Sequence, residues 1–356
     1  MRARDTAREQ SELKALRELS ARIGGNPLLI QASSGNTSIK IDGILWIKAS
    51  GKWLIDADED DFLVAVRLAR ANRCMRENTP ISETETNSSG GLRASIETAM
   101  HAVLPQKVVV HVHSVNTIAW AVREDGPRQL SARLSGLPWQ WIPYTPSGTS
   151  LARKIENALS CCPQTNVLVL GNHGLVVCAN TCRSAEQLLA EVEQRLAIEP
   201  RTGPRPQYAQ LKQALSGSAW SLPACAGVHS LATDRTSRRI LSGGVLYPCQ
   251  AIFLPRVMPV LASSACFQDL CCGRQELCAH QVLLVKDHGA LSSEHMTRAE
   301  REMLIGLANV VQRIDASAPL RYLTASEVID VLNGEGENYR RSANMNCYSK
   351  SSDAVV

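Results

Sequence analysis

The chain has 356 residues, 44% of them apolar, which suffices for one large or two medium domains with a substantial core. Its formal net charge is only +4, and its lysines and arginines are scattered along the sequence. This distribution predicts neither nucleic acid nor a membrane surface as a partner, whereas small anionic molecules remain compatible with it.

The N-terminal segment predicts an amphipathic helix. Apolar residues recur at helical spacing from Leu13 to Ile23, and the pair Gly24 and Gly25 is typical of a helix end. The segment lacks the apolar stretch of a secretory signal, and no apolar run in the chain reaches the roughly 18 residues of a membrane span. We therefore expect a cytoplasmic protein whose twelve cysteines are reduced.

The rest of the chain predicts strands and helices separated by turn residues. The expected elements are short strands within 28–55, a helix over 58–72, an exposed loop over 76–93, a helix over 95–104, a strand over 107–113, a helix over 115–122, strand structure over 167–179 and a helix over 184–198. The stretch 199–207 is rich in proline and polar residues. It is the best candidate boundary between a domain over 1–200 and an extension over 208–356.

Two histidines stand out in the apolar segment "KVVVHVHSVN" (107–116). Side chains alternate along a strand, so His111 and His113 project from the same face. Two imidazoles placed in this way can bind one metal ion, or they can form a hydrogen-bonded pair at a strand edge. The spacing by itself leaves both interpretations open.

A short internal similarity links the two halves. "VLVLGNHG" (167–174) resembles "VLLVKDHG" (282–289), and each is followed by a predicted helix. The second copy has no preceding HxH, so the similarity indicates a degenerate duplicated half. Since a metal site needs at least three converging ligands, we expect His288 to bind no metal.

Five separated stretches together resemble the class II aldolase/adducin family, which includes the fuculose- and rhamnulose-phosphate aldolases. They are "SSGNTSIK" (33–40), "KASGKWL" (48–54), "ASIETAMH" (94–101), "HVHS" (111–114) and "GNHGL" (171–175). The resemblance implies an α/β fold of three layers, with a central, mainly antiparallel sheet flanked by helices. Residues 208–356 would add a smaller C-terminal α/β unit.

The resemblance also implies a metal site. His111, His113 and His173 would bind Zn²⁺, or another divalent ion such as Fe²⁺, Mn²⁺ or Co²⁺. Glu97 would be the catalytic acid/base, although a glutamate in the first turn of a helix is also favoured by the helix dipole. For His101, a supporting role beside the metal site and plain helix packing are both open.

Four residues would hold a substrate phosphate by the same resemblance: Asn36, Ser50, Gly51 and Ser95. A tight turn explains Gly51 equally well without a ligand. The sequence departs from the family at Ile96, where phosphate-handling aldolases usually carry a second serine, so the phosphate or its placement is in question. Lys40, Lys48 and Lys52 could add positive potential, but we expect most of them to be merely solvated.

The implied activity is that of a lyase in carbohydrate metabolism. It would cleave a ketose 1-phosphate reversibly to dihydroxyacetone phosphate and an aldehyde, through an enediolate stabilised by zinc. Family aldolases are tetramers, so a homo-oligomer is expected, with a tyrosine from a neighbouring subunit completing the site. Alternatives are a dehydratase, decarboxylase, iron oxygenase or epimerase on the same fold, or a non-catalytic adducin-like module. Glu97 disfavours the epimerases, which carry aspartate, and the three histidines disfavour the module.

Overall fold

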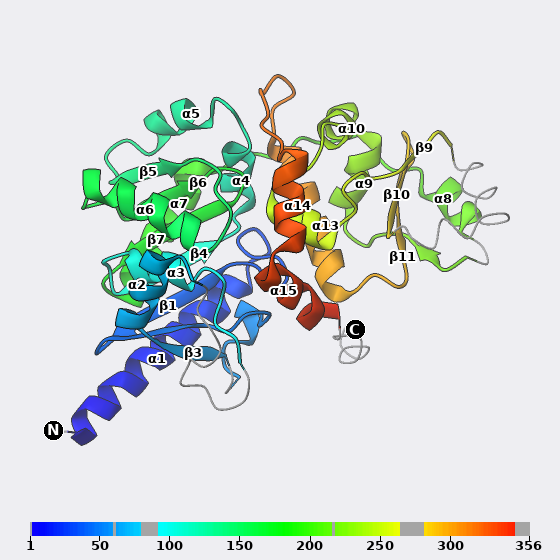
Figure 1. Cartoon of the computed structure of the whole chain (residues 1–356). Coiled ribbons are helices and arrows are strands. Elements are labelled where there is room, and N and C mark those ends of the chain that lie inside the picture. Colours follow the sequence, from blue (N-terminus) through cyan, green and yellow to red (C-terminus); the bar gives the residue numbers. More distant parts are fainter. Residues whose placement is uncertain (1, 60–61, 80–91, 216–217, 264–280, 346–356) are drawn as a thin grey trace.

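The computed structural model describes residues 2–59, 62–79, 92–215, 218–263 and 281–345. These residues form a mixed α/β structure with a seven-stranded sheet in the order β3-β2-β1-β4-β7-β6-β5 (Figure 1). The strands are β1 (Asn36–Ile41), β2 (Ile44–Lys48), β3 (Leu63–Arg67), β4 (Val108–Val112), β5 (Trp139–Ile142), β6 (Val167–Leu170) and β7 (Gly174–Ala179). Neighbouring strands are antiparallel except β5 and β6, which are parallel, so the predicted mainly antiparallel central sheet is confirmed.

Strand β4 shows why helices cover both faces of this sheet. Val108, Val110 and Val112 pack into the core under helices α1 (Arg2–Gly24) and α7 (Cys182–Leu196). Val109 packs into a second core, under α3 (Thr98–Val103) and α6 (Thr149–Cys161). The side chains of a strand alternate between faces, so an all-valine run buries both sides and produces the three predicted layers.

The prediction of a helix over 58–72 is wrong for the central part of this segment. The segment Leu63–Arg67 is strand β3, paired antiparallel with β2, and helix α2 begins only at Leu68 and runs to Glu77. Every residue from Leu63 to Val66 is buried, and such a continuous apolar run suits a strand covered on both faces. The predicted loop over 76–93 falls mostly outside the described residues.

The other predicted elements are present with shifted ends. The amphipathic helix ends at Gly24, and the helix expected from Ser95 begins at Thr98. The segment 167–179 is a hairpin of two strands, with a turn at Gly171–His173. The cysteines within the described residues form no disulfide with one another.

The second half carries its own four-stranded sheet in the order β8-β11-β10-β9. Its strands are β8 (Trp220–Ser221), β9 (Val260–Leu261), β10 (Val282–Val285) and β11 (Gly289–Ser293). Successive pairs are antiparallel, antiparallel and parallel, which repeats the order and directions of β4-β7-β6-β5.

The two hairpin turns also match. Asn172 and Asp287 both adopt left-handed backbone angles, with φ of 51° and 61°. Their N–H groups donate to Ala121 and Ala232, over 2.9 and 3.1 Å, and each acceptor lies in a helix that precedes the hairpin. A degenerate duplicated half predicts this correspondence, and we retain the duplication as a proposal.

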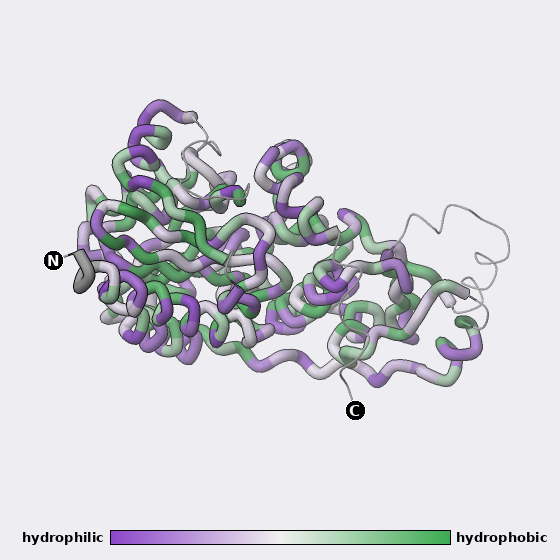
Figure 2. The backbone as a smooth tube through the Cα atoms, turned by 90° about the horizontal axis from the view of Figure 1, so that it is seen from below, coloured by the Kyte–Doolittle hydropathy of each residue, from purple (hydrophilic) through white to green (hydrophobic). Residues whose placement is uncertain are grey.

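One hydrophobic core joins the two halves. The other helices within the described residues are η1 (Leu54–Asp56), α4 (Val115–Ala121), α5 (Gly126–Arg133), α8 (Tyr208–Ala214), α9 (Ala226–Thr233), α10 (Arg235–Ser242), α11 (Pro248–Phe253), α13 (Arg298–Arg313), α14 (Ala325–Asn333) and α15 (Glu335–Met345). Ile118 of α4 and Leu307 of α13 are fully buried in the same apolar cluster. Figure 2 shows apolar segments through the interior of the larger half and polar segments at its edge. Within the described residues, no helix is long and apolar enough to cross a bilayer.

A polar link fastens the turn at Asn172 to the second half. The Asn172 side chain donates to the carbonyls of Leu246 and Arg321, over 2.9 and 2.8 Å, and accepts from the Arg321 guanidinium over 3.0 Å. The boundary predicted near residue 200 therefore lies between sequence segments that share both a core and buried hydrogen bonds.

We predict that Leu307→Ala destabilises the whole chain. Leu307 is fully buried in the shared core, so its truncation should lower the free energy of unfolding by about 2–5 kcal/mol. Urea unfolding followed by circular dichroism and by tryptophan fluorescence should give one coincident transition. Ile329→Ala is the control, because Ile329 is 50% exposed in α14, and it should shift little. Two separate transitions, with only one displaced by Leu307→Ala, would contradict a shared core.

Candidate metal centre

Three histidines from two parts of the central sheet meet in the structure. His111 lies in β4, His113 follows its end, and His173 lies in the turn between β6 and β7. One ligand atom from each imidazole lies within 4.8 Å of the others, and the Nε2 atoms of His111 and His113 are 3.2 Å apart. All three are buried, with exposed fractions of 0%, 3% and 5%. The structure thus brings together the residues predicted as ligands.

Gly174 allows this convergence. A Cβ at this position would lie 2.5 Å from the backbone oxygen of Val112, and 3.3 and 3.4 Å from the rings of His111 and His113. Any larger residue would push the β6–β7 turn away from β4. The glycine that follows His173 therefore sets the distance at which the third imidazole approaches the other two.

Hydrogen bonds at the rear of the rings orient the imidazoles. The Nδ1 atom of His111 lies 3.0 Å from the carbonyl oxygen of Leu175, to which it must donate, so its Nε2 carries a lone pair. The Nδ1 atom of His113 lies 3.4 Å from Cys249 Sγ, which can accept in the same way. Burial lowers the pKa of His111 to about 4 and that of His113 well below its usual value, so both rings are neutral at neutral pH.

Glu97 contacts the histidine cluster. It is the N-cap residue of α3 and is 5% exposed. Its two carboxylate oxygens lie 3.4 Å from His111 Nε2 and 3.2 Å from His173 Nε2. Burial raises the pKa of Glu97, but hydrogen bonds from His173 and Asn36 act in the opposite direction, and the pKa lies well below its usual range. The carboxylate is therefore ionised.

The donor set fits a divalent cation. Neutral His111 directs the lone pair of Nε2 toward an ionised carboxylate oxygen 3.4 Å away and toward the Nε2 of His113 at 3.2 Å. The lone pair of His111 and the anionic oxygen of Glu97 repel each other at this distance, and a cation between them would convert the repulsion into coordination. Three imidazoles suit Zn²⁺ and other first-row divalent ions, and they leave coordination positions for a substrate or water.

His101 belongs to a chain of hydrogen bonds that ends at Glu97. Its ring lies 2.7 Å from Ser38 Oγ through Nδ1 and 2.5 Å from Asn36 Oδ1 through Nε2. The Asn36 amide in turn donates to Glu97 over 2.7 Å and to Ser95 Oγ over 3.2 Å. Burial lowers the pKa of His101 to about 3, so the neutral ring holds the amide of Asn36 with its N–H groups toward the carboxylate. Of the two open interpretations, the contacts favour the supporting role.

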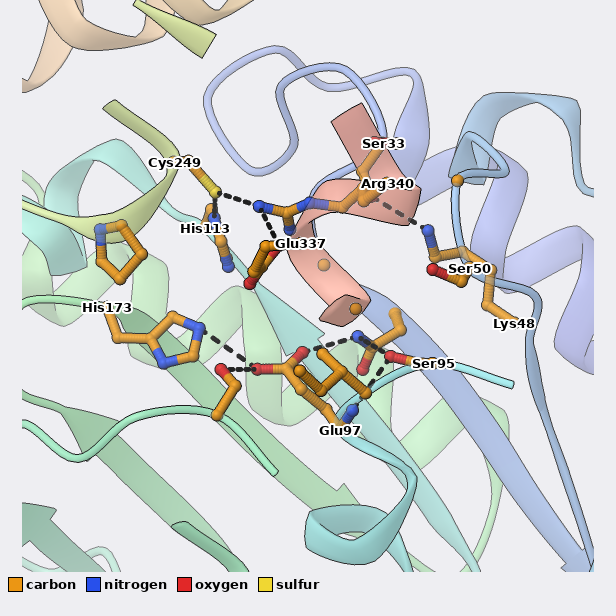
Figure 3. Close-up of a pocket in the computed structure, with 17 residues that line it drawn as sticks. Ser33, Lys48, Ser50, Ser95, Glu97, His113, His173, Cys249, Glu337 and Arg340 are labelled. Atoms are coloured by element: carbon orange, nitrogen blue, oxygen red, sulfur yellow. Dashed lines mark hydrogen bonds and ion pairs between the residues drawn. The ribbon is translucent and has the colours of Figure 1, made fainter. Parts of the chain in front are cut away.

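One pocket collects the predicted substrate-binding residues. Asn36, Ser50, Gly51 and Ser95 line it together with Glu97, His113 and His173 (Figure 3). Gly51 has φ of +80°, so its turn requires glycine whether or not a ligand binds. Ser147, which comes from the stretch before α6, also lines the pocket and donates to Glu97 over 3.2 Å.

The expectation that the lysines are mostly solvated is wrong for Lys48. Its side chain is buried, lines the pocket, and donates to the carbonyls of Ser33 and Lys52 over 3.0 and 2.6 Å. Burial chiefly, and then Arg340, lowers its pKa to about 7, while Glu97 acts in the opposite direction. The position in a strand whose other members are largely apolar was the available sequence signal.

Sequence reasoning missed every pocket residue from the second half. These residues are Pro248, Cys249, Gly336, Glu337 and Arg340. They lie more than a hundred positions from Glu97 in the sequence and carry no motif, so only the folded chain places them at the pocket.

His288 differs from its counterpart His173. Its Nδ1 lies 2.7 Å from the backbone oxygen of Lys286, and Asp287 pairs with Arg238 over 2.8 Å. Among the residues that the structure describes, the three histidines of the first half are the group with metal-ligand geometry. His288 thus makes a contact within its own turn, and Asp287 forms an ion pair.

The sequence profile of the family "Class II Aldolase and Adducin N-terminal domain" matches residues 16–199, more than half of the chain. The chain therefore belongs to this family. An uncharacterized oxidoreductase of Bacillus subtilis, YuxG, is 27% identical over 213 residues, which are 53% of this chain but only 31% of that relative. The chain thus spans less than a third of that relative's length.

Solved structures similar to this chain cover about half of it. The N-terminal class II aldolase domain of a conserved Thermoplasma acidophilum protein is 23% identical, with a TM-score of 0.47, over 52% of this chain and 92% of that one. The l-fuculose-1-phosphate aldolase of Thermus thermophilus is 20% identical, with a TM-score of 0.37, over 55% and 93% of the two chains.

We predict that the purified protein binds about one equivalent of divalent metal per chain, because one described group has ligand geometry. His111→Ala should reduce the metal content to near zero, since two imidazoles hold an ion far more weakly than three. His288→Ala is the matched control and should keep one equivalent. Elemental analysis by mass spectrometry measures all three proteins. Loss of metal in His288→Ala, or its retention in His111→Ala, would refute the assignment.

Proposed function

We propose that the protein is a metal-dependent lyase that cleaves a ketose 1-phosphate to dihydroxyacetone phosphate and an aldehyde. The observation that carries the proposal is the contact of the ionised Glu97 carboxylate with the buried cluster of His111, His113 and His173. Family membership supports a lyase, and the pocket beside the cluster is polar, as a sugar requires.

A divalent ion held by the three imidazoles would supply Lewis-acid stabilisation of the negative charge that develops on the substrate carbonyl oxygen. Zn²⁺ is our proposed ion, because neutral imidazole is among its preferred ligands. The backbone oxygen of Leu175 fixes the tautomer of His111 that such binding needs.

Glu97 would carry the proton. Cleavage would break the bond between C3 and C4, transfer the C4 hydroxyl proton to the Glu97 carboxylate, and leave an electron pair at C3 that must be protonated. A carboxylate beside this carbon can return the proton as its acid form. Asn36 and Ser147 each donate to one oxygen of Glu97, so the side chain has a fixed orientation toward the pocket.

The substrate phosphate would bind in the pocket beside Glu97. Asn36, Ser50, Gly51 and Ser95 are our proposed ligands, since hydroxyl, amide and backbone N–H groups suit phosphate oxygens. The same residues fit other anionic or hydroxylated groups. A screen of ketose 1-phosphates against their unphosphorylated sugars therefore tests the proposal, with inorganic phosphate as a competitor. Turnover of unphosphorylated sugars without inhibition by phosphate would contradict it.

Product analysis separates this reaction from others possible at such a site. Release of dihydroxyacetone phosphate supports aldol cleavage. Release of carbon dioxide, loss of water, inversion at a carbon or reduction of a nicotinamide would each reject it. We further propose a homo-oligomer, with a tetramer as the expectation from family resemblance, which light scattering can measure.

We predict that Glu97→Gln lowers kcat by roughly two to four orders of magnitude, the usual contribution of general acid–base catalysis. The amide keeps the shape of the side chain but cannot carry the proton, so metal content and thermal stability should stay close to wild type. Glu156→Gln, at an exposed position of α6, is the control and should be fully active. Unchanged turnover in Glu97→Gln would refute its role.

A further inference from the structure

Helix α15 lies across the pocket, opposite Glu97. Figure 3 shows Arg340 and Glu337 of this helix on one side of the pocket and Glu97 with Ser95 on the other. Asn344, near the end of the same helix, accepts from Trp53 Nε1 over 2.7 Å and donates to Ser33 Oγ over 2.9 Å. The helix is thus fastened to the first half by buried hydrogen bonds.

The same helix packs against Gly51 and against Ile96, which adjoins Ser95 in the sequence. A Cβ at Gly51 would lie 2.7 Å from Ala343, so the helix covers this turn directly. A Cβ at Gly336 would lie 2.8 Å from the Ile96 side chain, which offers no hydrogen-bond donor. Gly51 and Ile96 therefore contact α15, and this helix places its charged side chains at the pocket.

Arg340 retains unused hydrogen-bonding capacity. One of its terminal nitrogens pairs with Glu337 over 3.0 Å and lies 3.3 Å from Cys249 Sγ. Its Nε is buried and has no hydrogen-bond partner. A guanidinium has five N–H donors and binds carboxylate or phosphate oxygens in pairs, so an anion in the pocket would supply the missing acceptor.

Lys48 is the second cation of the pocket. Its ammonium group has three N–H donors, and two of them are used by the carbonyls of Ser33 and Lys52. Burial chiefly, and then Arg340, lowers its pKa to about 7. Glu337 pairs with Arg340, and Glu97 contacts the histidine cluster, so neither carboxylate is paired with Lys48. An anion bound beside Lys48 would therefore neutralise the positive charge of its ammonium group.

We propose that Lys48 and Arg340 together bind an anionic group of the substrate, a carboxylate or a phosphate, beneath α15. The second half would then select the substrate of the first half within one chain. This inference rests on the proposed function and deepens it by naming two cations, one from each half, that bind the anionic group, and direct measurement of anion binding does not depend on aldol cleavage.

Arg340→Met tests the proposal, with Arg341→Met as the matched control. Arg341 is the next residue of the same helix, and its side chain is exposed. Calorimetric titration of the metal-loaded protein with inorganic phosphate, and separately with glycolate, measures the two candidate groups. Wild type and Arg341→Met should bind at least one of them equally well. Arg340→Met and Lys48→Met should each weaken that binding roughly tenfold to hundredfold, the usual effect of losing a charged hydrogen bond.

Arg340→Lys is the control for misfolding. It keeps the positive charge but cannot form the two parallel hydrogen bonds of a guanidinium. It should bind the anion with an affinity between those of wild type and Arg340→Met, at wild-type metal content and melting temperature. Anion binding that is absent in wild type, or that persists unchanged in Arg340→Met and Lys48→Met, would overturn the proposal. If binding depends on Arg340 but no aldol cleavage occurs, the anion site stands and the proposed reaction fails.

Discussion

Four ionisable side chains are buried within a few ångströms of one another in this protein, and the surrounding structure has to satisfy each of them. A buried polar group without a partner costs about 1–3 kcal/mol, and a buried unpaired charge costs more. His111 is satisfied at its rear by Leu175, and Glu97 accepts hydrogen bonds from Asn36 and Ser147. The one interaction that the described residues do not supply is a positive charge between facing lone pairs. A metal ion fits that gap, and the elements around it maintain its geometry.

The second half supports this centre at two points. Arg321 holds the turn of His173 through Asn172, and Cys249 contacts the rear of His113 over 3.4 Å. Both contacts depend on the apolar core that α4 and α13 share. Loosening that core would move the metal ligands as well as lower the stability, because the ligand positions are set by packing from both sides.

The pocket also shows how a repeated topology can acquire a different use. Strands β8 to β11 follow the order of β4 to β7, yet His288 has turn contacts where His173 faces the cluster. Beyond this sheet, the chain continues into α14 and α15, and the latter reaches back to the pocket. Under our proposals, the second half contributes charge and shape to the reaction centre of the first half and binds no metal of its own.

Local sequence patterns predict most of the helices and strands and the residue types of the metal centre. The alternation of side chains along the strand "VVVHV" places His111 on one face, and the turn residues of "GNHG" indicate where the chain reverses at His173. Patterns over a few residues carry this information because backbone periodicity is local. The same locality explains the error at Leu63–Val66, where a short apolar run fits a helix or a buried strand equally well until β2 pairs with it. The tertiary structure alone shows that Cys249 and Arg340 reach the pocket. Their positions depend on how two halves of the chain pack together, and contacts between residues so distant in sequence leave no periodic signal in either segment.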